Sequence, residues 1–231
     1  MRVAIVENTV VTHHGQVGVA LHEVAARIDV YKPWRDGVLP ESGDHDALVV
    51  LGGEQSALAD TTHPYLPLLA QLMRDTGESG RAVLGICLGS QVMARGLGAQ
   101  NVLGTASEFG WREVRLTGAG SDDPVLSNVP VSFPIFQWHA DTFTLPPGAV
   151  HLATSDGAMM QCIRTGRASY GMQFHFEASR ALVADWTRTF PDAVERNEPG
   201  WTAAHPARAA TLGAAADLHG LSIARAWVGL I

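Results

Sequence analysis

The stretch Arg81–Gln91 reads RAVLGICLGSQ and carries the strongest structural signal in the chain. Its first half is a short apolar run typical of a buried strand, and a helix is predicted from Ser90 to Leu97. Cys87 therefore stands at a turn between a strand and a helix. Gly85 and Gly89, two residues before and two after the cysteine, permit a tight turn because they carry no side chain.

A cysteine at such a turn is well placed to react. The N-terminus of the following helix favours the thiolate over the thiol, and the backbone N–H groups freed at the turn are candidates for an oxyanion hole. The alternative is that Cys87 is a small core residue, as most cysteines beside buried strands are. The glycines and the strand-turn-helix context favour the reactive interpretation.

The segments before this turn alternate between strands and helices. Apolar runs at 2–7 and 46–51 predict two further buried strands. Helices are predicted over 16–28, from its apolar face, and from Pro64 onward, since proline is tolerated in a first turn. This alternation predicts an α/β fold with a mostly parallel central sheet covered by helices on both faces.

The pattern changes after about residue 101, where shorter β-like pieces are separated by Gly and Pro. We expect a small antiparallel portion at the edge of the same sheet. The β-like pieces and the expected closing strands are 112–116, 131–136, 151–154, 159–164 and 169–176. The length of 231 residues suits a single domain, with a core over about 1–180 and a helical C-terminal extension over about 181–231.

Composition excludes several classes of function. The net charge is −7 with only 16 Lys and Arg residues and no basic run, so neither nucleic acid nor an anionic membrane is an expected partner. The first apolar run breaks at Glu7 and Asn8, which does not fit a signal peptide, and no stretch is long enough for a membrane helix.

Cysteine and histidine usage points to a reducing cytoplasm without a metal site. The two cysteines, Cys87 and Cys162, are too few for a disulfide scaffold or a Cys-based zinc site. The ten histidines show no metal-ligand spacing, and we expect no metal or other cofactor. Cys162 is expected in the core, and His13 and His14 at the surface or at the rim of a pocket.

A second motif, Gly171–Glu177, reads GMQFHFE. His175 and Glu177 are two residues apart on a predicted strand, so their side chains share a face. A carboxylate beside an imidazole fixes its tautomer and leaves Nε2 to deprotonate a thiol. Alone, such a pair is more often a solvated strand face, but with Cys87 it supplies a nucleophile, a base and an orienting group.

The two motifs together resemble the class I (triad) glutamine amidotransferase family, and the chain looks like a stand-alone member similar to GMP synthase glutaminases. Residues 85–91 fit the family's G-x-C-x-G-x-Q turn, and 173–177 fit its Q-x-H-x-E strand, with Phe176 where the family commonly has proline. Leu51–Glu54 resembles its glycine turn, although Glu54 often corresponds to proline, and Gln137–Asp141 resembles its W-H-x-D segment. The resemblance covers roughly residues 1–180 and implies a flavodoxin-like fold.

The resemblance also implies a role for each matching residue. Cys87 would attack the γ-carboxamide of glutamine, His175 would transfer the thiol proton to departing ammonia, and Glu177 would orient His175. Backbone N–H groups of Gly53 and Leu88 would form the oxyanion hole. The residues implied to position the substrate are Gln91, Trp138, His139, Ala140 and Asp141.

These features imply a cysteine-dependent amidohydrolase that acts on glutamine or another γ-glutamyl amide through a thioester. The chain has no phosphate-binding loop, no pyrophosphatase motif and no room for a synthetase domain. A glutaminase subunit for a separate synthetase and a stand-alone γ-glutamyl peptide hydrolase therefore remain as alternatives, with the oligomeric state open. A catalytically silent regulatory or scaffold module is a third possibility, against which the intact triad argues.

Two further polar residues lie near the start of a predicted strand. The segment Ser107–Trp111 resembles a family stretch close to the glutamine pocket. Glu108 and Arg112 are therefore expected either to contact the substrate or to form a solvated strand end.

Overall fold

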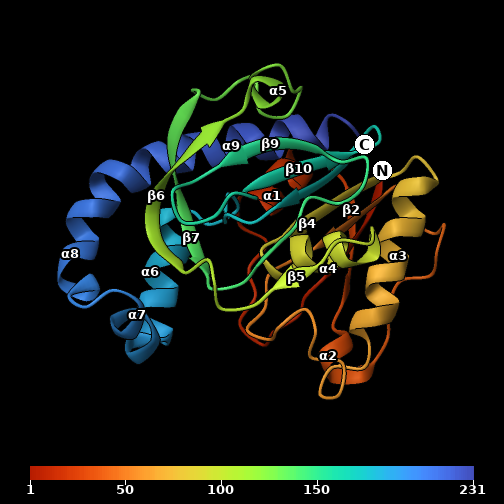
Figure 1. Cartoon of the computed structure of the whole chain (residues 1–231), viewed down its shortest axis with the longest axis horizontal. Helices are drawn as coiled ribbons and strands as arrows, with labels where there is room; N and C mark the ends of the chain where they lie inside the picture. The colour runs from red at the N-terminus through yellow and green to blue at the C-terminus, as the bar shows by residue number, and fades with distance from the viewer.

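A large mixed sheet lies at the centre of the protein, between two layers of helices (Figure 1). The computed structural model describes residues 1–231. The strands run in the order β2-β1-β3-β4-β11-β10-β9-β6-β7. Their bounds are β1 (Arg2–Val6), β2 (Arg27–Tyr31), β3 (Ala47–Val50), β4 (Ala82–Ile86), β6 (Glu108–Leu116), β7 (Ser132–His139), β9 (Val150–Thr154), β10 (Cys162–Thr165) and β11 (Ser169–Met172).

The first five strands of this order are parallel, and the other four pair antiparallel at one edge. This confirms the predicted parallel sheet with an antiparallel portion at its edge. A second, two-stranded sheet pairs β5 (Asn101–Val102) with β8 (Thr142–Phe143). The helices are α1 (Gly15–Glu23), α2 (Pro33–Asp36), α3 (Leu66–Glu78), α4 (Leu88–Gly96), α5 (Gly118–Ser121), α6 (Arg180–Thr189), α7 (Pro191–Asn197), α8 (Trp201–Arg208), the π-helical turn η1 (Ala209–Gly213) and α9 (Ala214–Val228).

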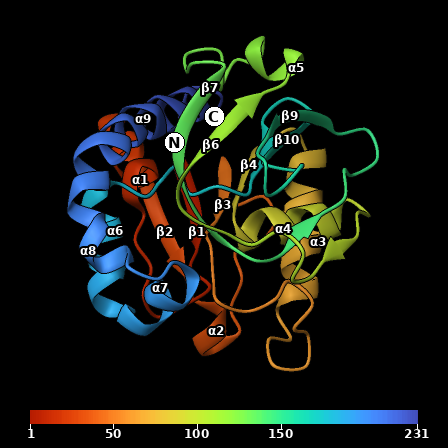
Figure 2. The same cartoon turned by 60° about the vertical axis from the view of Figure 1, so that its left-hand side comes forward.

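Both faces of the parallel strands are buried, which explains their nearly continuous apolar sequences. Along β1, Val3 and Ile5 belong to the larger hydrophobic cluster, into which α1 and α9 pack. Ala4 and Val6 point to the opposite face and pack with residues of α3 and α4. Figure 2 shows α1 and α9 gathered on one side of the strands and α3 and α4 on the other.

The helix predicted over 16–28 was wrong beyond Glu23. The chain turns at Ala25, whose φ is 52°, and then forms the edge strand β2 in parallel register with β1. Val24 and Ile28 matched the helical period, but Val24 is half exposed. Cross-strand pairing outweighed this local pattern, and the Arg2 guanidinium reaches across from β1 to donate to Asp29 at 2.6 Å.

The C-terminal residues are helical, as predicted, and they share the main core. Trp201 in α8 and Trp227 in α9 are fully buried in the same cluster as the central strands. Helices α6, α7 and α8 cover the antiparallel end of the sheet (Figure 1). None of the helices combines the length and the apolar character needed to cross a membrane.

Candidate active site

Cys87 lies where β4 ends and α4 begins, at the N-cap position of the helix. Its φ of 51° and ψ of −110° are strained for a residue with a side chain and cost on the order of 1–3 kcal/mol. A Cβ atom at Gly85 would lie 2.4 Å from the Gly89 carbonyl oxygen, and one at Gly89 would lie 2.0 Å from that of Val50. The turn therefore requires both glycines, as their spacing in the sequence predicted.

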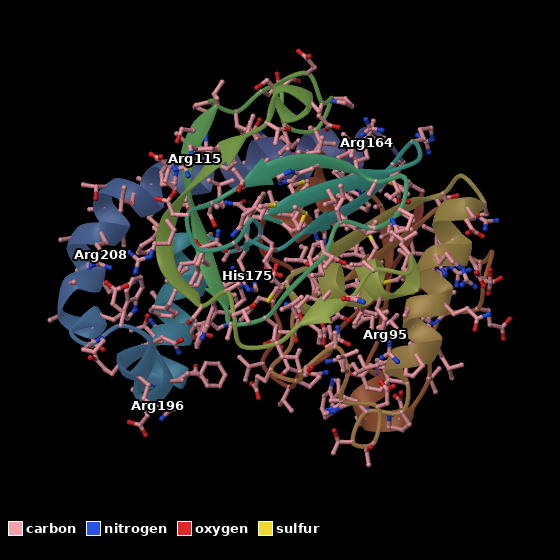
Figure 3. All side chains as sticks on the ribbon, viewed as in Figure 1. Arg95, Arg115, Arg164, His175, Arg196 and Arg208 are labelled. Carbon is pink, nitrogen blue, oxygen red and sulfur yellow. The ribbon has the colours of Figure 1, made fainter.

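His175 and Glu177 lie beyond the end of β11, which stops at Met172. The prediction of one continuous strand over 169–176 was wrong because only a single bridge, between His175 and Phe136, continues the pairing. The two side chains nevertheless meet: His175 Nδ1 is 2.7 Å from a Glu177 carboxylate oxygen. Both residues are buried, and Figure 3 shows His175 near the middle of the molecule.

The surroundings of His175 favour its charged form. Burial opposes protonation, but the negative charges of Glu177 and Cys87, with hydrogen bonds to both groups, raise the pKa of His175 well above its usual 6.5. Because the Glu177 carboxylate is only 2.7 Å away, the imidazolium can form an ion pair with it. This arrangement suits a cysteine nucleophile paired with a histidine base.

The Gly52–Gly53 turn after β3 lies directly against these groups. A Cβ at Gly52 would stand 3.2 Å from His175 Cε1 and 3.6 Å from Cys87 Cβ. A Cβ at Gly53 would come within 2.8 Å of the Leu88 side chain. Leu88 is the first residue of α4, so its N–H has no acceptor within the helix.

The segment Trp138–Asp141 comprises the last two residues of β7 and the first two residues of the loop that follows it. The Trp138 carbonyl oxygen is 3.7 Å from Cys87 Sγ, and His139 Nδ1 is 3.1 Å from the Asp141 carbonyl oxygen. Gln91 donates from its side-chain amide to that same carbonyl, at 3.3 Å, and to Gln173, at 3.2 Å. Gln91 thus connects this loop to α4.

One pocket of about 680 Å³ brings all of these residues together. Every residue singled out from the sequence as catalytic, oxyanion-binding or substrate-binding lines it. They are Cys87, His175, Glu177, Gly53, Leu88, Gln91, Trp138, His139, Ala140 and Asp141.

Sequence reasoning missed several other residues that line this pocket. Part of this lining comes from the loop after β1, including Val11 and Thr12. The carboxyl end of a parallel strand is a common ligand-binding position, and this rule could have pointed to the loop. Other lining residues come from α6, from α7 and from the single residue between them, a region without a recognisable motif. These residues are Trp186, Phe190, Ala193 and Asn197.

The other polar residues have mixed outcomes. Both expectations for Glu108 were wrong: it is buried and accepts hydrogen bonds from Ser155 and Gln161 outside the pocket lining. Arg112 forms an exposed ion pair with Glu198, also away from the pocket. His13 lies at the pocket rim, as expected, where its Nε2 is 3.1 Å from an Asp185 oxygen.

Cys162 belongs to the same hydrophobic cluster as Cys87, but it lies outside the pocket and away from His175. It is fully buried in β10, as predicted, and belongs to the main hydrophobic cluster. Burial raises the pKa of its thiol well above 9.0, and the nearby Asp123 adds to this effect. Cys162 therefore serves as an internal comparison for Cys87.

Comparison with known proteins places this site in a family. The model of the glutamine amidotransferase class-I family matches residues 12–183. This chain therefore belongs to the class I glutamine amidotransferase family, as the two motifs suggested. The matched range contains every site residue predicted from the sequence.

Curated relatives agree with this assignment. YfeJ, a glutamine amidotransferase-like protein of Salmonella typhimurium, is 34% identical over 141 residues, which cover 60% of this chain and 59% of YfeJ. A glutamine-hydrolysing GMP synthase subunit of Haloarcula marismortui is 30% identical over 74% of this chain and 85% of its own length. The matched region thus spans less than two thirds of YfeJ but most of the Haloarcula protein.

Solved structures confirm the fold. A glutamine amidotransferase of Thermotoga maritima superimposes with a TM-score of 0.83 at 26% identity, covering 98% of this chain and 96% of that one. The shared fold therefore extends over nearly the whole chain, including the C-terminal helices.

Proposed function

We propose that this protein hydrolyses the γ-carboxamide of glutamine, or of another γ-glutamyl amide, through a thioester on Cys87. The observation that supports this proposal most strongly is the meeting of a thiol, an imidazole and a carboxylate in one pocket, from segments far apart in the sequence. Family membership supports the γ-glutamyl identity of the acyl group. A hydrophobic core alone would not require a thiol, an imidazole and a carboxylate to meet in one pocket.

The proposed chemistry follows from the geometry. The Cys87 thiolate adds to the γ-carbonyl carbon, and the N–H groups of Gly53 and Leu88 stabilise the oxyanion that forms. Protonated His175 donates to the departing nitrogen, so that ammonia or an amine leaves as the C–N bond breaks. His175 then accepts a proton from the water that attacks the thioester. The C–S bond breaks, glutamate is released, and the thiolate beside protonated His175 is restored.

The Trp138–Asp141 segment is proposed to position the glutamyl group. Its backbone contacts Cys87 Sγ and is held by Gln91 on α4. Gln91 is 4% exposed and already bonded to two partners. In this proposal, Gln91 acts by keeping the segment in place.

The direct test is incubation of the purified protein with glutamine and measurement of both products. We expect glutamate and ammonia in equal amounts, and the same assay with γ-glutamyl amides should release the corresponding amines. Absence of turnover with glutamine and with every γ-glutamyl amide would contradict the proposal.

The fate of the ammonia forms a separate part of the proposal. The relative from Haloarcula marismortui is named as one subunit of a GMP synthase. By analogy, a separate synthetase is one proposed acceptor of the ammonia, and stimulation of glutamine turnover by lysate of the source cell would support it.

The two unpaired cysteines support a proposed cytoplasmic location.

Replacing Glu177 with glutamine should shift the pH dependence of activity. The charge of Glu177 helps raise the pKa of His175, so its loss should lower that pKa. Since acylation requires protonated His175 beside the thiolate, the alkaline limb of kcat/KM should move to lower pH. The turnover number should also fall, on the order of 10²–10⁴-fold, because proton transfer is impaired.

The same substitution should change how stability depends on pH. A raised pKa in the folded chain means that protonation of His175 stabilises the native state fully below about 6.5. That contribution is lost as the pH rises through the folded value, and it should shrink in Glu177→Gln. Glu78→Gln on α3 removes an exposed carboxylate outside the pocket and should change neither profile. An unaltered alkaline limb in Glu177→Gln would show that Glu177 does not control His175.

A further inference from the structure

The pocket continues past the triad along three aromatic side chains, which we call the aromatic wall: Trp138, Trp186 and Phe190. Trp138 lies near the end of β7, whereas Trp186 belongs to α6 and Phe190 precedes α7. Ring centroids are 5.8 Å apart for Trp138 and Trp186 and 6.0 Å apart for Trp138 and Phe190. All three side chains are only partly buried and line the pocket, so they present apolar surface to a ligand.

The aromatic wall borders the group that leaves during the reaction. The departing nitrogen must accept a proton from His175, so the leaving group has to lie beside this imidazole. Trp186 packs edge-on against the same imidazole, with centroids 5.4 Å apart. Ammonia would leave this aromatic surface uncovered, whereas an amine with an apolar substituent would cover it.

The charged side chains around the pocket further restrict which amines can act as the leaving group. No arginine or lysine lines the pocket. Each lining histidine already faces a carboxylate: His13 is 3.1 Å from Asp185, His139 is 3.3 Å from Glu108 and His175 is 2.7 Å from Glu177.

A carboxylate on the leaving group would therefore find no unpaired cationic side chain. It would also meet the acidic groups of Glu54 and Asp141, which line the same pocket. The glutamyl end of a substrate differs, because it carries its own ammonium beside its carboxylate. An uncharged leaving group avoids the cost of removing an unpaired charge from water.

We propose that the preferred substrates are γ-glutamyl amides of amines with an uncharged, apolar aromatic substituent, a specificity that rests on the proposed function. In this reaction, Cys87 Sγ forms a bond to the γ-carbonyl carbon and the C–N bond breaks. The amine nitrogen takes the proton held by His175. Water then hydrolyses the thioester, and glutamate is released.

The test compares three substrates that differ in one feature at a time. γ-Glutamylphenethylamide and γ-glutamylphenylalanine share an aromatic leaving group and differ by one carboxylate, while glutamine has neither. We expect kcat/KM for the phenethylamide to exceed that for glutamine by about 10-fold or more, because the ring buries apolar surface. The value for γ-glutamylphenylalanine should lie well below that for the phenethylamide.

Substitutions then locate the effect in the aromatic wall. Phe190→Ala should lower the ratio of phenethylamide to glutamine kcat/KM about 10-fold, since apolar contact is lost. Ala193→Phe should lower the same ratio by narrowing this part of the pocket, without depending on removal of an aromatic side chain. Leu218→Ala, an exposed apolar position in α9 outside the pocket, should leave the ratio unchanged.

The outcomes separate the two proposals. Turnover of glutamine without preference for the phenethylamide, or a ratio that neither pocket variant changes, would overturn the specificity while leaving the proposed function intact. Equal or better use of γ-glutamylphenylalanine would overturn the charge argument. Failure to hydrolyse any of the three substrates would contradict the proposed function itself.

Discussion

Replacing Cys87 with alanine should abolish hydrolysis of glutamine and γ-glutamyl amides, with kcat reduced by more than about 10⁴-fold. The reason is that no other nucleophile is available at the same position: the thiol is the group at the end of β4 that stands beside His175 and the Gly52–Gly53 turn. Residual turnover would have to come from water held in the pocket. Mass spectrometry of the glutamate formed is sensitive enough to measure a reduction in kcat of this size.

The matched control for this prediction is Cys162→Ala. Cys162 is fully buried in β10 and lies outside the pocket, so its removal should preserve activity at a small cost in stability. Circular dichroism and thermal unfolding should show that Cys87→Ala is folded. Undiminished turnover in a folded Cys87→Ala protein would exclude Cys87 as the nucleophile.

Gly89→Ala should destabilise the fold by about 3 kcal/mol or more. The new Cβ would lie 2.0 Å from the Val50 carbonyl oxygen and 2.8 Å from its carbon, so α4 would have to move away from β3. These contacts are with backbone atoms, which cannot turn aside as a flexible side chain could. Displacement of α4 would also misplace Cys87 and Leu88, so activity should fall together with stability.

Gly118→Ala is the appropriate comparison. Gly118 begins α5, does not have a positive φ and would have no atom within 4 Å of an added Cβ. The free energy of unfolding of the Gly118→Ala variant should remain within about 1 kcal/mol of that of the wild-type protein, as expected for Gly→Ala in a helix. Urea unfolding of both variants measures the difference, and equal stability would show that α4 does not pack closely on β3.

The parts of the site that could be predicted from the sequence depend on local chemistry. The turn around Cys87 requires small residues on both sides, and the close approaches of Gly85 and Gly89 explain why no larger residue fits. His175 and Glu177 were likewise recognisable, because a two-residue spacing brings their side chains together even though β11 ends before them. Requirements of this kind leave short and specific patterns in a sequence.

The features that escaped prediction depend on contacts between distant segments. Strand β2 follows α1 almost directly and pairs with β1. Apolar residues at helical spacing continued to Ile28, so the local sequence predicted a longer helix and gave no sign of this pairing. Glu108 lies at a strand start that looked solvated, but Ser155 and Gln161 from other segments bury and satisfy its carboxylate.

Two of the three side chains of the aromatic wall, Trp186 and Phe190, escaped prediction for the same reason. Trp186 and Phe190 have ordinary helical surroundings in the sequence, and only the packing of α6 and α7 beside the sheet brings them to the pocket. Their position near His175 means that the C-terminal helices border the reacting groups as well as cover the core.

The central claim is that Cys87 is the nucleophile of a pocket that recognises the glutamyl group. The most direct measurement is labelling with 6-diazo-5-oxo-norleucine, a reactive glutamine analogue, followed by peptide mass spectrometry. We expect a single adduct on Cys87, suppressed by excess glutamine, while Cys162 stays unmodified. Absence of an adduct on Cys87, or labelling that glutamine does not suppress, would contradict the account.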